Sequence, residues 1–167
     1  GAGKSTLMKV LSGVYPYGTY SGDIVVNGQV SQFHSIQQSE EAGIAIIHQE
    51  LALIPYMTIG ENMFLGNERG KRFAIDWDTT YGEADKYLKI VGLKESSRAL
   101  IKDIGVGKQQ MVEIAKALAK HAKLLILDEP ANFVDNRFEG ELYELLKQLN
   151  ERIAIVMVSH DLGTITS

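Results

Sequence analysis

Short apolar runs recur along the chain, and the stretches that separate them carry the period of amphipathic helices. The runs are continuous rather than alternating, which is typical of parallel strands covered on both faces of a sheet. We expect buried strands at residues 44–47, 124–127 and 153–158. Helices between successive strands are consistent with right-handed crossovers. The pattern therefore predicts an α/β domain built on a parallel sheet.

Several segments between these strands predict helices. In the first of them we expect Leu7, Val10 and Leu11 to point inward and Gly13 to end the helix. The third opens with glycines and a lysine and continues as a helix with an apolar stripe. The segments are residues 5–13, 82–93, 104–118 and 138–150.

Two other stretches carry different signals. The pair Asn27–Gly28 predicts a tight hairpin turn between two strands. Residues 51–100 show mostly helical patterning, with breaks at Pro55, at Gly60 and around residues 66–70. We interpret the hairpin as a small β subdomain and the helical region as an insertion in the α/β core.

Composition limits the classes of function. The chain has 167 residues, which suggests one domain with a sizeable core, and 45% hydrophobic with 23% charged residues is typical of a globular protein. The formal net charge of −4 gives no electrostatic support for nucleic-acid binding. The sequence has no cysteine, which excludes disulfides and thiolate catalysis and fits a reducing compartment. Its apolar runs fall well short of the roughly 20 residues that a membrane-spanning helix needs.

The first six residues, GAGKST, match the end of the phosphate-binding loop G-x-x-x-x-G-K-[ST]. Glycines let backbone N–H groups converge on phosphate oxygens, and the following helix directs its positive dipole end at the same anion. We expect Lys4 to reach the β- and γ-phosphates, Ser5 to ligate Mg²⁺ and Thr6 to contact the α-phosphate. The alternative is a glycine-rich helix start with a surface lysine. We expect the backbone N–H groups of Gly1, Ala2 and Gly3 to contact the phosphates.

Polar side chains follow the apolar strands. Asp128 and Glu129 end one strand, Gln49 follows another and His160 follows the last. Ligands of open α/β sheets bind beyond the carboxyl ends of the strands, so these side chains could face one pocket. We expect Asp128 to hold Mg²⁺ through water and Glu129 to polarise an attacking water. Gln49 can serve both the ion and the water, and His160 can donate to the γ-phosphate.

Taken singly, each of these residues could be an ordinary surface or loop residue. Their order along the chain favours the functional interpretation, and it resembles the ATP-binding subunit of ABC transporters over essentially the whole chain. The motifs of that family are Walker A (GAGKST), Q-loop (Gln49), signature (IGVGKQQ), Walker B (LLILDE), D-loop (NFVD, 132–135) and H-loop (His160).

Longer segments narrow the resemblance. SGVYPYGTYSGDI, AGIAIIHQELALIPYMTIGENMFLGNE and VGKQQMVEIAKALAK are similar to the monosaccharide importers, especially the xylose and multiple-sugar type. Such ATPases usually carry two nucleotide-binding halves in one polypeptide. This chain resembles the N-terminal half trimmed at both ends, with the first glycine of the phosphate loop and the preceding strand expected upstream of Gly1. We therefore expect the isolated chain to bind ATP weakly or not at all.

The resemblance implies a P-loop NTPase (RecA-like) core, a small antiparallel β subdomain and a helical ABC subdomain. Two such domains would sandwich two ATP molecules, with Gly105 and Gly107 of one domain next to the ATP held by the other. The implied divisions are about 14–50 for the β subdomain and Q-loop region, about 51–115 for the helical subdomain with the signature, and about 1–13 with 116–167 for the ATP-binding core.

The implied function is the binding and hydrolysis of ATP, with Mg²⁺, to power import of a monosaccharide. The implied partners are a second nucleotide-binding domain and a transmembrane sugar permease, which the region from Gln49 to Gly60 would contact. A sugar-binding protein would take part indirectly, and no nucleic acid is implied. Such a subunit lies peripherally on the cytoplasmic face of the bacterial inner membrane.

The signature departs from the usual L-S-x-G-Q of the family. Ile104, Gly105 and Lys108 replace three of its residues, and Gly107 is kept. Gly105 removes a hydroxyl whose hydrogen bond to a phosphate would contribute about 1.5–3 kcal/mol. We interpret Lys108 as added charge beside this anion site. Ala131 stands where threonine or serine is usual.

Three other functions remain open from the sequence. One is a soluble, non-transport ABC ATPase, as in DNA repair or translation. Another is a kinase or GTPase with the same phosphate loop, although it gives no role to the signature or to His160. The third is a non-hydrolysing nucleotide-binding half with a regulatory role, which the changes at Gly105 and Ala131 keep open.

Overall fold

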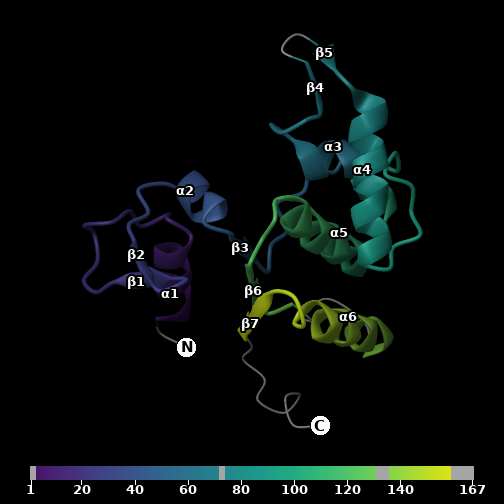
Figure 1. Cartoon of the computed structure of the whole chain (residues 1–167). Helices are drawn as coiled ribbons and strands as arrows, with labels where there is room; N and C mark the ends of the chain where they lie inside the picture. The colour runs from purple at the N-terminus through teal and green to yellow at the C-terminus, as the bar shows by residue number, and fades with distance from the viewer. Residues whose placement is uncertain (1–2, 72–73, 131–135, 159–167) are drawn as a thin grey trace.

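The computed structural model describes residues 3–71, 74–130 and 136–158. Helices and short strands are interspersed along the chain (Figure 1). In chain order the elements are α1 (Lys4–Leu11), β1 (Ile24–Val26), β2 (Gln29–Ser31), α2 (Ile36–Glu41), β3 (Ile44–Ile47), α3 (Ile59–Phe64), β4 (Gly70–Lys71), β5 (Ala74–Ile75), α4 (Trp77–Ile90), the short 3-10 helix η1 (Ile101–Asp103), α5 (Val106–Ala119), β6 (Leu124–Asp128), α6 (Asn136–Leu149) and β7 (Ala154–Val158).

The central sheet is parallel. Within the described residues its strand order is β3–β6–β7. Ile47 of β3 pairs with Leu127 of β6, and Asp128 of β6 pairs with Val158 of β7. The carboxyl ends of these strands therefore lie at one edge of the sheet. The prediction of an α/β core on a parallel sheet is confirmed.

Side chains of β6 alternate between two apolar clusters. Leu125 and Leu127 are fully buried in the larger cluster, together with residues of α3, α4, α5 and α6. Ile126 belongs to the smaller cluster, which includes Met8 of α1 and Ile24 of β1. The sheet thus separates two bodies: α1, α2 and the β1–β2 hairpin lie on one side, and α3 to α6 lie on the other (Figure 1).

The last strand differs from its prediction. We expected β7 to be buried, but Val156 is 46% exposed and Met157 is 37% exposed. Within the described ranges β7 pairs only with β6, so it is an edge strand of the sheet. Ile155 packs against the larger cluster and is partly buried. Apolar composition predicted the strand correctly, but it could not predict how much of the strand is covered.

Helix α1 is confirmed with a different face inward. Met8 is its buried residue, whereas Leu7, which we expected to point inward, is 59% exposed. Val10 and Leu11 pack against the smaller cluster, as predicted. The helix ends before Gly13, whose φ of +74° is the left-handed conformation that glycine adopts at helix ends.

The hairpin prediction is confirmed. β1 and β2 are antiparallel, and Val26 pairs with Gln29 across the turn. Asn27 and Gly28 have φ of +53° and +79°. Two successive left-handed residues are typical of the type I′ turn, which matches the twist of the flanking strands.

The region of residues 51–100 holds more than helices. It contains the helices α3 and α4, but also the β4–β5 hairpin, which the sequence analysis missed. Helix α4 begins at Trp77, five residues before the predicted start, because the Asp76 carboxylate caps it by accepting the backbone N–H of Thr79 at 3.0 Å. This hydrogen bond and a second one from the Thr79 hydroxyl hold the pKa of Asp76 below its ordinary value. None of the helices in the described ranges is long and apolar enough to cross a membrane.

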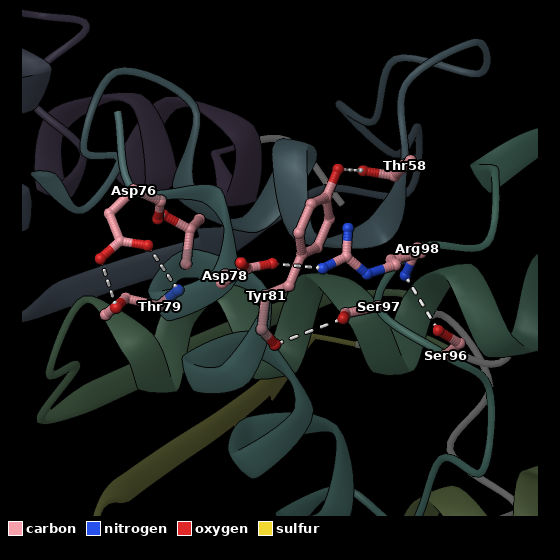
Figure 2. A network of polar contacts seen from close by, with 9 residues as sticks. Thr58, Asp76, Asp78, Thr79, Tyr81, Ser96, Ser97 and Arg98 are labelled. Carbon is pink, nitrogen blue, oxygen red and sulfur yellow. Dashed lines mark hydrogen bonds and ion pairs between the residues drawn. The ribbon is translucent and has the colours of Figure 1, made fainter. Parts of the chain in front are cut away.

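The predicted helix break at Gly60 is wrong. Gly60 is the second residue of α3. An ideal Cβ at this position would lie 2.5 Å from Cδ1 of Tyr81 on α4, so glycine allows the two helices to approach closely. Tyr81 is fixed on two sides (Figure 2): its hydroxyl lies 3.2 Å from that of Thr58, and the Arg98 guanidinium lies 4.2 Å from its ring centroid. Arg98 is itself paired with Asp78 at 2.9 Å.

These contacts give opposite predictions for two helical glycines. Gly60→Ala should lower the free energy of unfolding by about 1–3 kcal/mol, because Tyr81 cannot move away from the new methyl group. Gly82→Ala on α4 should raise it by about 0.5–1 kcal/mol, because its Cβ would meet nothing within 4 Å and alanine favours the helix. Urea denaturation measures both. Equal effects of the two substitutions would contradict the proposed role of Tyr81.

Candidate functional site

The start of α1 carries the described part of the phosphate-loop sequence. Gly3 precedes the helix with φ of +114°, a conformation that strongly favours glycine, and no side chain caps the helix. Ser5 and Thr6 are exposed and Lys4 is half-buried. The first N–H groups of a helix without a side-chain cap are satisfied by water or by a ligand, and the helix dipole favours an anion there. Gly1 and Ala2 lie outside the described residues.

Packing fixes the position of this helix start. Met8 belongs to the same buried cluster as Ile44 of β3 and Ile126 of β6, so α1 lies against one face of the sheet. In Figure 1 the N-terminal end of α1 and the C-terminal end of β7 both lie in the lower part of the view. The start of α1 therefore lies toward the end of the sheet at which the strands finish.

The strand ends hold three of the predicted site residues. Asp128 is the last residue of β6, Glu129 follows it, and Gln49 lies two residues beyond Ile47, the last residue of β3. Ile47 pairs with Leu127, so Gln49 and Glu129 occupy equivalent positions beyond this pair. Gln49 is exposed, and the two acidic residues are half-buried. The backbone thus places all three at one edge of the sheet, whereas their chemical roles stay predictions.

The backbone turns sharply at Glu129. Its φ of +48° lies in the left-handed region, which costs residues other than glycine about 1–2 kcal/mol. Strain of this kind concentrates at functional sites, where the surrounding structure maintains it. Here the Glu129 N–H donates to the Val158 carbonyl of β7 at 2.7 Å, which ties the turn to the neighbouring strand. The residue proposed to polarise water is therefore fixed at the junction of two strands.

Other predicted residues lie outside the described ranges. These are His160, Ala131 and the segment 132–135 that corresponds to the D-loop. Their assignments stay predictions from the sequence.

The glycine-led turn before α5 is open to solvent on its outer side. Gly105 is the N-cap residue, it has no side-chain cap, and it is exposed together with Val106. Its φ of −66° suits any residue, and a Cβ there would meet nothing within 4 Å. From the inner side, the Gln109 amide donates to the carbonyls of Ile101 and Ile104 at 3.2 and 3.0 Å. The turn is therefore held from within while its outer backbone stays accessible.

Lys108 has a different role from the one we expected. Its ammonium forms an ion pair with the carboxylate of Glu95, which lies in the loop after α4. The Lys108 side chain is 50% exposed and that of Glu95 is 19% exposed. The hydrogen bond from Lys108 lowers the pKa of Glu95 below its ordinary 4.5. Lys108 therefore does not present an unbalanced charge beside Gly105, because Glu95 already neutralises it.

Sequence reasoning missed both partners that hold this turn. Gln109 directly follows Lys108, and a polar side chain in the first turn of a helix can reach back to the preceding carbonyls, so a signal was present. Glu95 lies 13 residues before Lys108 in an irregular loop. Only the fold shows that the end of α4 returns to the start of α5.

The chain is similar to known proteins in sequence and in fold. The family model described as ABC transporter matches residues 1–132. The chain is 58% identical over 167 residues to the L-arabinose transport ATP-binding protein of Geobacillus stearothermophilus, and 54% identical over 166 residues to the xylose import ATP-binding protein of Moorella thermoacetica. A solved dimeric bacterial ABC transporter cassette matches with a TM-score of 0.74 and 25% identity, over 96% of this chain and 71% of that chain.

The chain belongs to the ABC transporter family. Each of the two relatives named above is matched over 99% of this chain but only 33% of its own length, so the chain spans about a third of those proteins. In the terms of the ABC family, α1 starts within the described part of the expected Walker A motif, β6 lies within the expected Walker B motif, and α5 starts inside the expected signature.

The ion pair at the ABC signature predicts a pH-dependent stability. Glu95→Gln should lower the free energy of unfolding by about 0.5–1 kcal/mol at pH 7, because one partner is half exposed to solvent. The folded-state pKa of Glu95 is lower than the unfolded one, so its contribution is complete above about pH 4.5 and is lost as the pH falls through the folded value.

Urea denaturation of Glu95→Gln and of the parent chain at several pH values measures this difference. It should be present at pH 7 and should shrink below about pH 4.5. Glu151→Gln, at an exposed position that follows α6, is the matched control and should differ little from the parent. A difference that persists unchanged in acid would show that the charge of Glu95 is not its cause.

Proposed function

We propose that this chain is part of an ATPase that binds and hydrolyses ATP to power import of a monosaccharide. One observation carries the proposal: Gln49, Asp128 and Glu129 follow neighbouring parallel strands at one end of the sheet, toward which the phosphate-loop helix also starts (Figure 1). In phosphoryl transfer the protein mainly positions groups and stabilises charge. This end combines a helix N-terminus suited to phosphate with carboxylates suited to water and a metal ion.

The roles within this site follow the chemistry of each side chain. Lys4 reaches the β- and γ-phosphates and Thr6 contacts the α-phosphate, next to the backbone of the phosphate loop. Glu129 accepts a hydrogen bond from the attacking water and polarises it. Gln49 orients that water, and His160 donates to the γ-phosphate.

Ser5, Gln49 and Asp128 fit a magnesium ion in their donor chemistry. They offer hydroxyl, amide carbonyl and carboxylate oxygens, which are the ligands Mg²⁺ prefers. Across the described residues, no three acidic or histidine side chains gather into a metal site of their own. Proteins usually hold Mg²⁺ through few side chains together with substrate phosphates and water. When bound, the ion neutralises negative charge on the phosphates.

The proposed substrate class and permease partner rest on relatives and on one surface. The relatives named above are described as L-arabinose transport and xylose import proteins, which favours a monosaccharide as cargo. Beyond Gln49, Ile54 is 41% exposed and Tyr56 is 79% exposed. The Lys102 ammonium lies 4.9 Å from the Tyr56 ring centroid. This surface of apolar and cationic groups is where we place the permease contact, on the cytoplasmic face of the bacterial inner membrane, with a sugar-binding protein acting indirectly.

The second partner we propose is another nucleotide-binding domain, in the same polypeptide or in a dimer. The exposed backbone at Gly105 and Val106 supports this, because an accessible turn at a helix start suits the phosphates of an ATP molecule held by the other domain. Gly107, the second residue of α5, completes this signature turn of residues 105–107. In this arrangement each ATP site is completed by two domains.

Replacing Glu129 tests the proposal. In the intact protein Glu129→Gln should lower the rate of ATP hydrolysis by roughly 10²–10⁴-fold, because an amide cannot accept a proton from water. ATP binding, measured by calorimetry, should persist. Glu151→Gln makes the same chemical change at an exposed position away from the strand ends and should hydrolyse ATP like the parent. Undiminished turnover in Glu129→Gln would refute the assignment.

Sugar uptake tests the transport part separately. A deletion strain complemented with the Glu129→Gln gene should fail to accumulate the transported monosaccharide, whereas complementation with the parent gene restores uptake. If ATP hydrolysis is lost and uptake is unaffected, the chain is an ATPase of another kind.

A further inference from the structure

Gly107 is confined by a residue of its own chain. An ideal Cβ at this position would lie 2.8 Å from Cδ1 and from Cε1 of Phe138, and 2.9 Å from Cγ. Cβ atoms in proteins do not approach other atoms so closely, so the ring fills the place that a side chain at residue 107 would need. Gly105, two residues earlier, has open space at the same point. The two glycines of the signature therefore differ: the space beside Gly107 is occupied by the ring, whereas the space beside Gly105 is open.

The ring belongs to α6, the helix that follows β6 in the chain. Phe138 lies near the start of α6, and α6 follows the strand β6 that ends at Asp128. Phe138 is half-buried and packs against the larger apolar cluster. Leu142 and Leu145 anchor the same helix in that cluster. The anchored helix fixes the backbone of Phe138, and packing against the cluster restricts the ring.

An open cleft lies beside the contact between Gly107 and Phe138. A cleft of about 1010 Å³ lies between the end of α4, the start of α5 and α6, and Phe138 and Met111 are among its lining residues. Glu95 and Lys108, the ion pair described above, line the same cleft. The signature turn is thus held toward α4 by an ion pair and toward α6 by one aromatic ring.

We propose that Phe138 is a positioning residue, which through its contact with Gly107 fixes the signature turn relative to α6 and hence to the Asp128–Glu129 end of β6. This inference rests on the proposed function. In that function the carboxylates serve the ATP bound by this domain, and the signature turn serves the ATP held by the other domain. The contact therefore ties two ATP sites together within one chain.

A double-mutant cycle in the intact protein tests the contact itself. Gly107→Ala should lower Tm by about 2–10 °C, because the new methyl group overlaps the ring. The same substitution in a Phe138→Ala background should change Tm little, because the ring is gone. Gly105→Ala is the matched steric control and should leave Tm nearly unchanged. An equal penalty for Gly107→Ala in both backgrounds would overturn the inference.

Kinetics separate positioning from stability. Phe138→Ala should lower kcat for ATP hydrolysis by about 10- to 100-fold with little change in KM, because the turn is misplaced while the phosphate loop is intact. Phe138→Tyr keeps the ring and should restore kcat. Gly82→Ala, a glycine change at an exposed position of α4 with open space at its Cβ, should hydrolyse ATP like the parent. A kcat of Phe138→Ala equal to that of the parent, or a loss that Phe138→Tyr does not restore, would contradict the inference.

The two proposals fail in distinguishable ways. If the parent protein does not hydrolyse ATP, the proposed function fails, and the thermal cycle still decides whether Phe138 confines Gly107. If the parent hydrolyses ATP and the cycle shows no coupling, only the positioning role of Phe138 fails.

Discussion

The parallel pairing of β6 with β3 on one side and β7 on the other is the constraint on which the rest of the structure depends. It aligns the carboxyl ends of the strands, so that Asp128, Glu129 and Gln49 reach one edge although the sequence separates them widely. The same strand divides the interior, because alternate side chains face two apolar clusters. The phosphate-loop helix packs in one cluster and α5 in the other. A slip of one residue in β6 would therefore disturb both clusters and the strand ends together.

Much of this architecture could be predicted from the sequence, because it follows from local chemistry. Continuous apolar runs identified the three strands of the central sheet, and Asn27–Gly28 identified the β1–β2 hairpin through its left-handed turn. The apolar stripe of α5 was equally clear, since Met111, Ile114 and Ala115 are all buried. At the site, Gln49, Asp128 and Glu129 lie at the carboxyl ends of strands, as the sequence predicted. Their roles come from motif chemistry and family membership, and the backbone geometry is consistent with them.

The errors share a physical cause: each depended on what a segment packs against. Leu7 and β7 were expected to be buried because they are apolar, yet Leu7 and two residues of β7 are exposed to solvent. Gly60 was interpreted as a helix break, but it lies inside α3. Glycine stands at this helical position because the ring of Tyr81 occupies the space that a side chain would need. Lys108 was interpreted as a free charge because its partner Glu95 lies in a distant loop. Composition and spacing carry no information about such partners.

The signature turn shows why a motif cannot be interpreted from residue types alone. Gly105 and Gly107 are the same residue type within one motif, but only one of them is confined by its own chain. At Gly105 the lack of a side chain leaves the outer backbone open, which suits a ligand that approaches from another domain. At Gly107 the space is already occupied by the ring of Phe138, so the glycine there serves the junction between α5 and α6. One motif can thus combine recognition of a ligand with the internal packing that sets where the ligand is met.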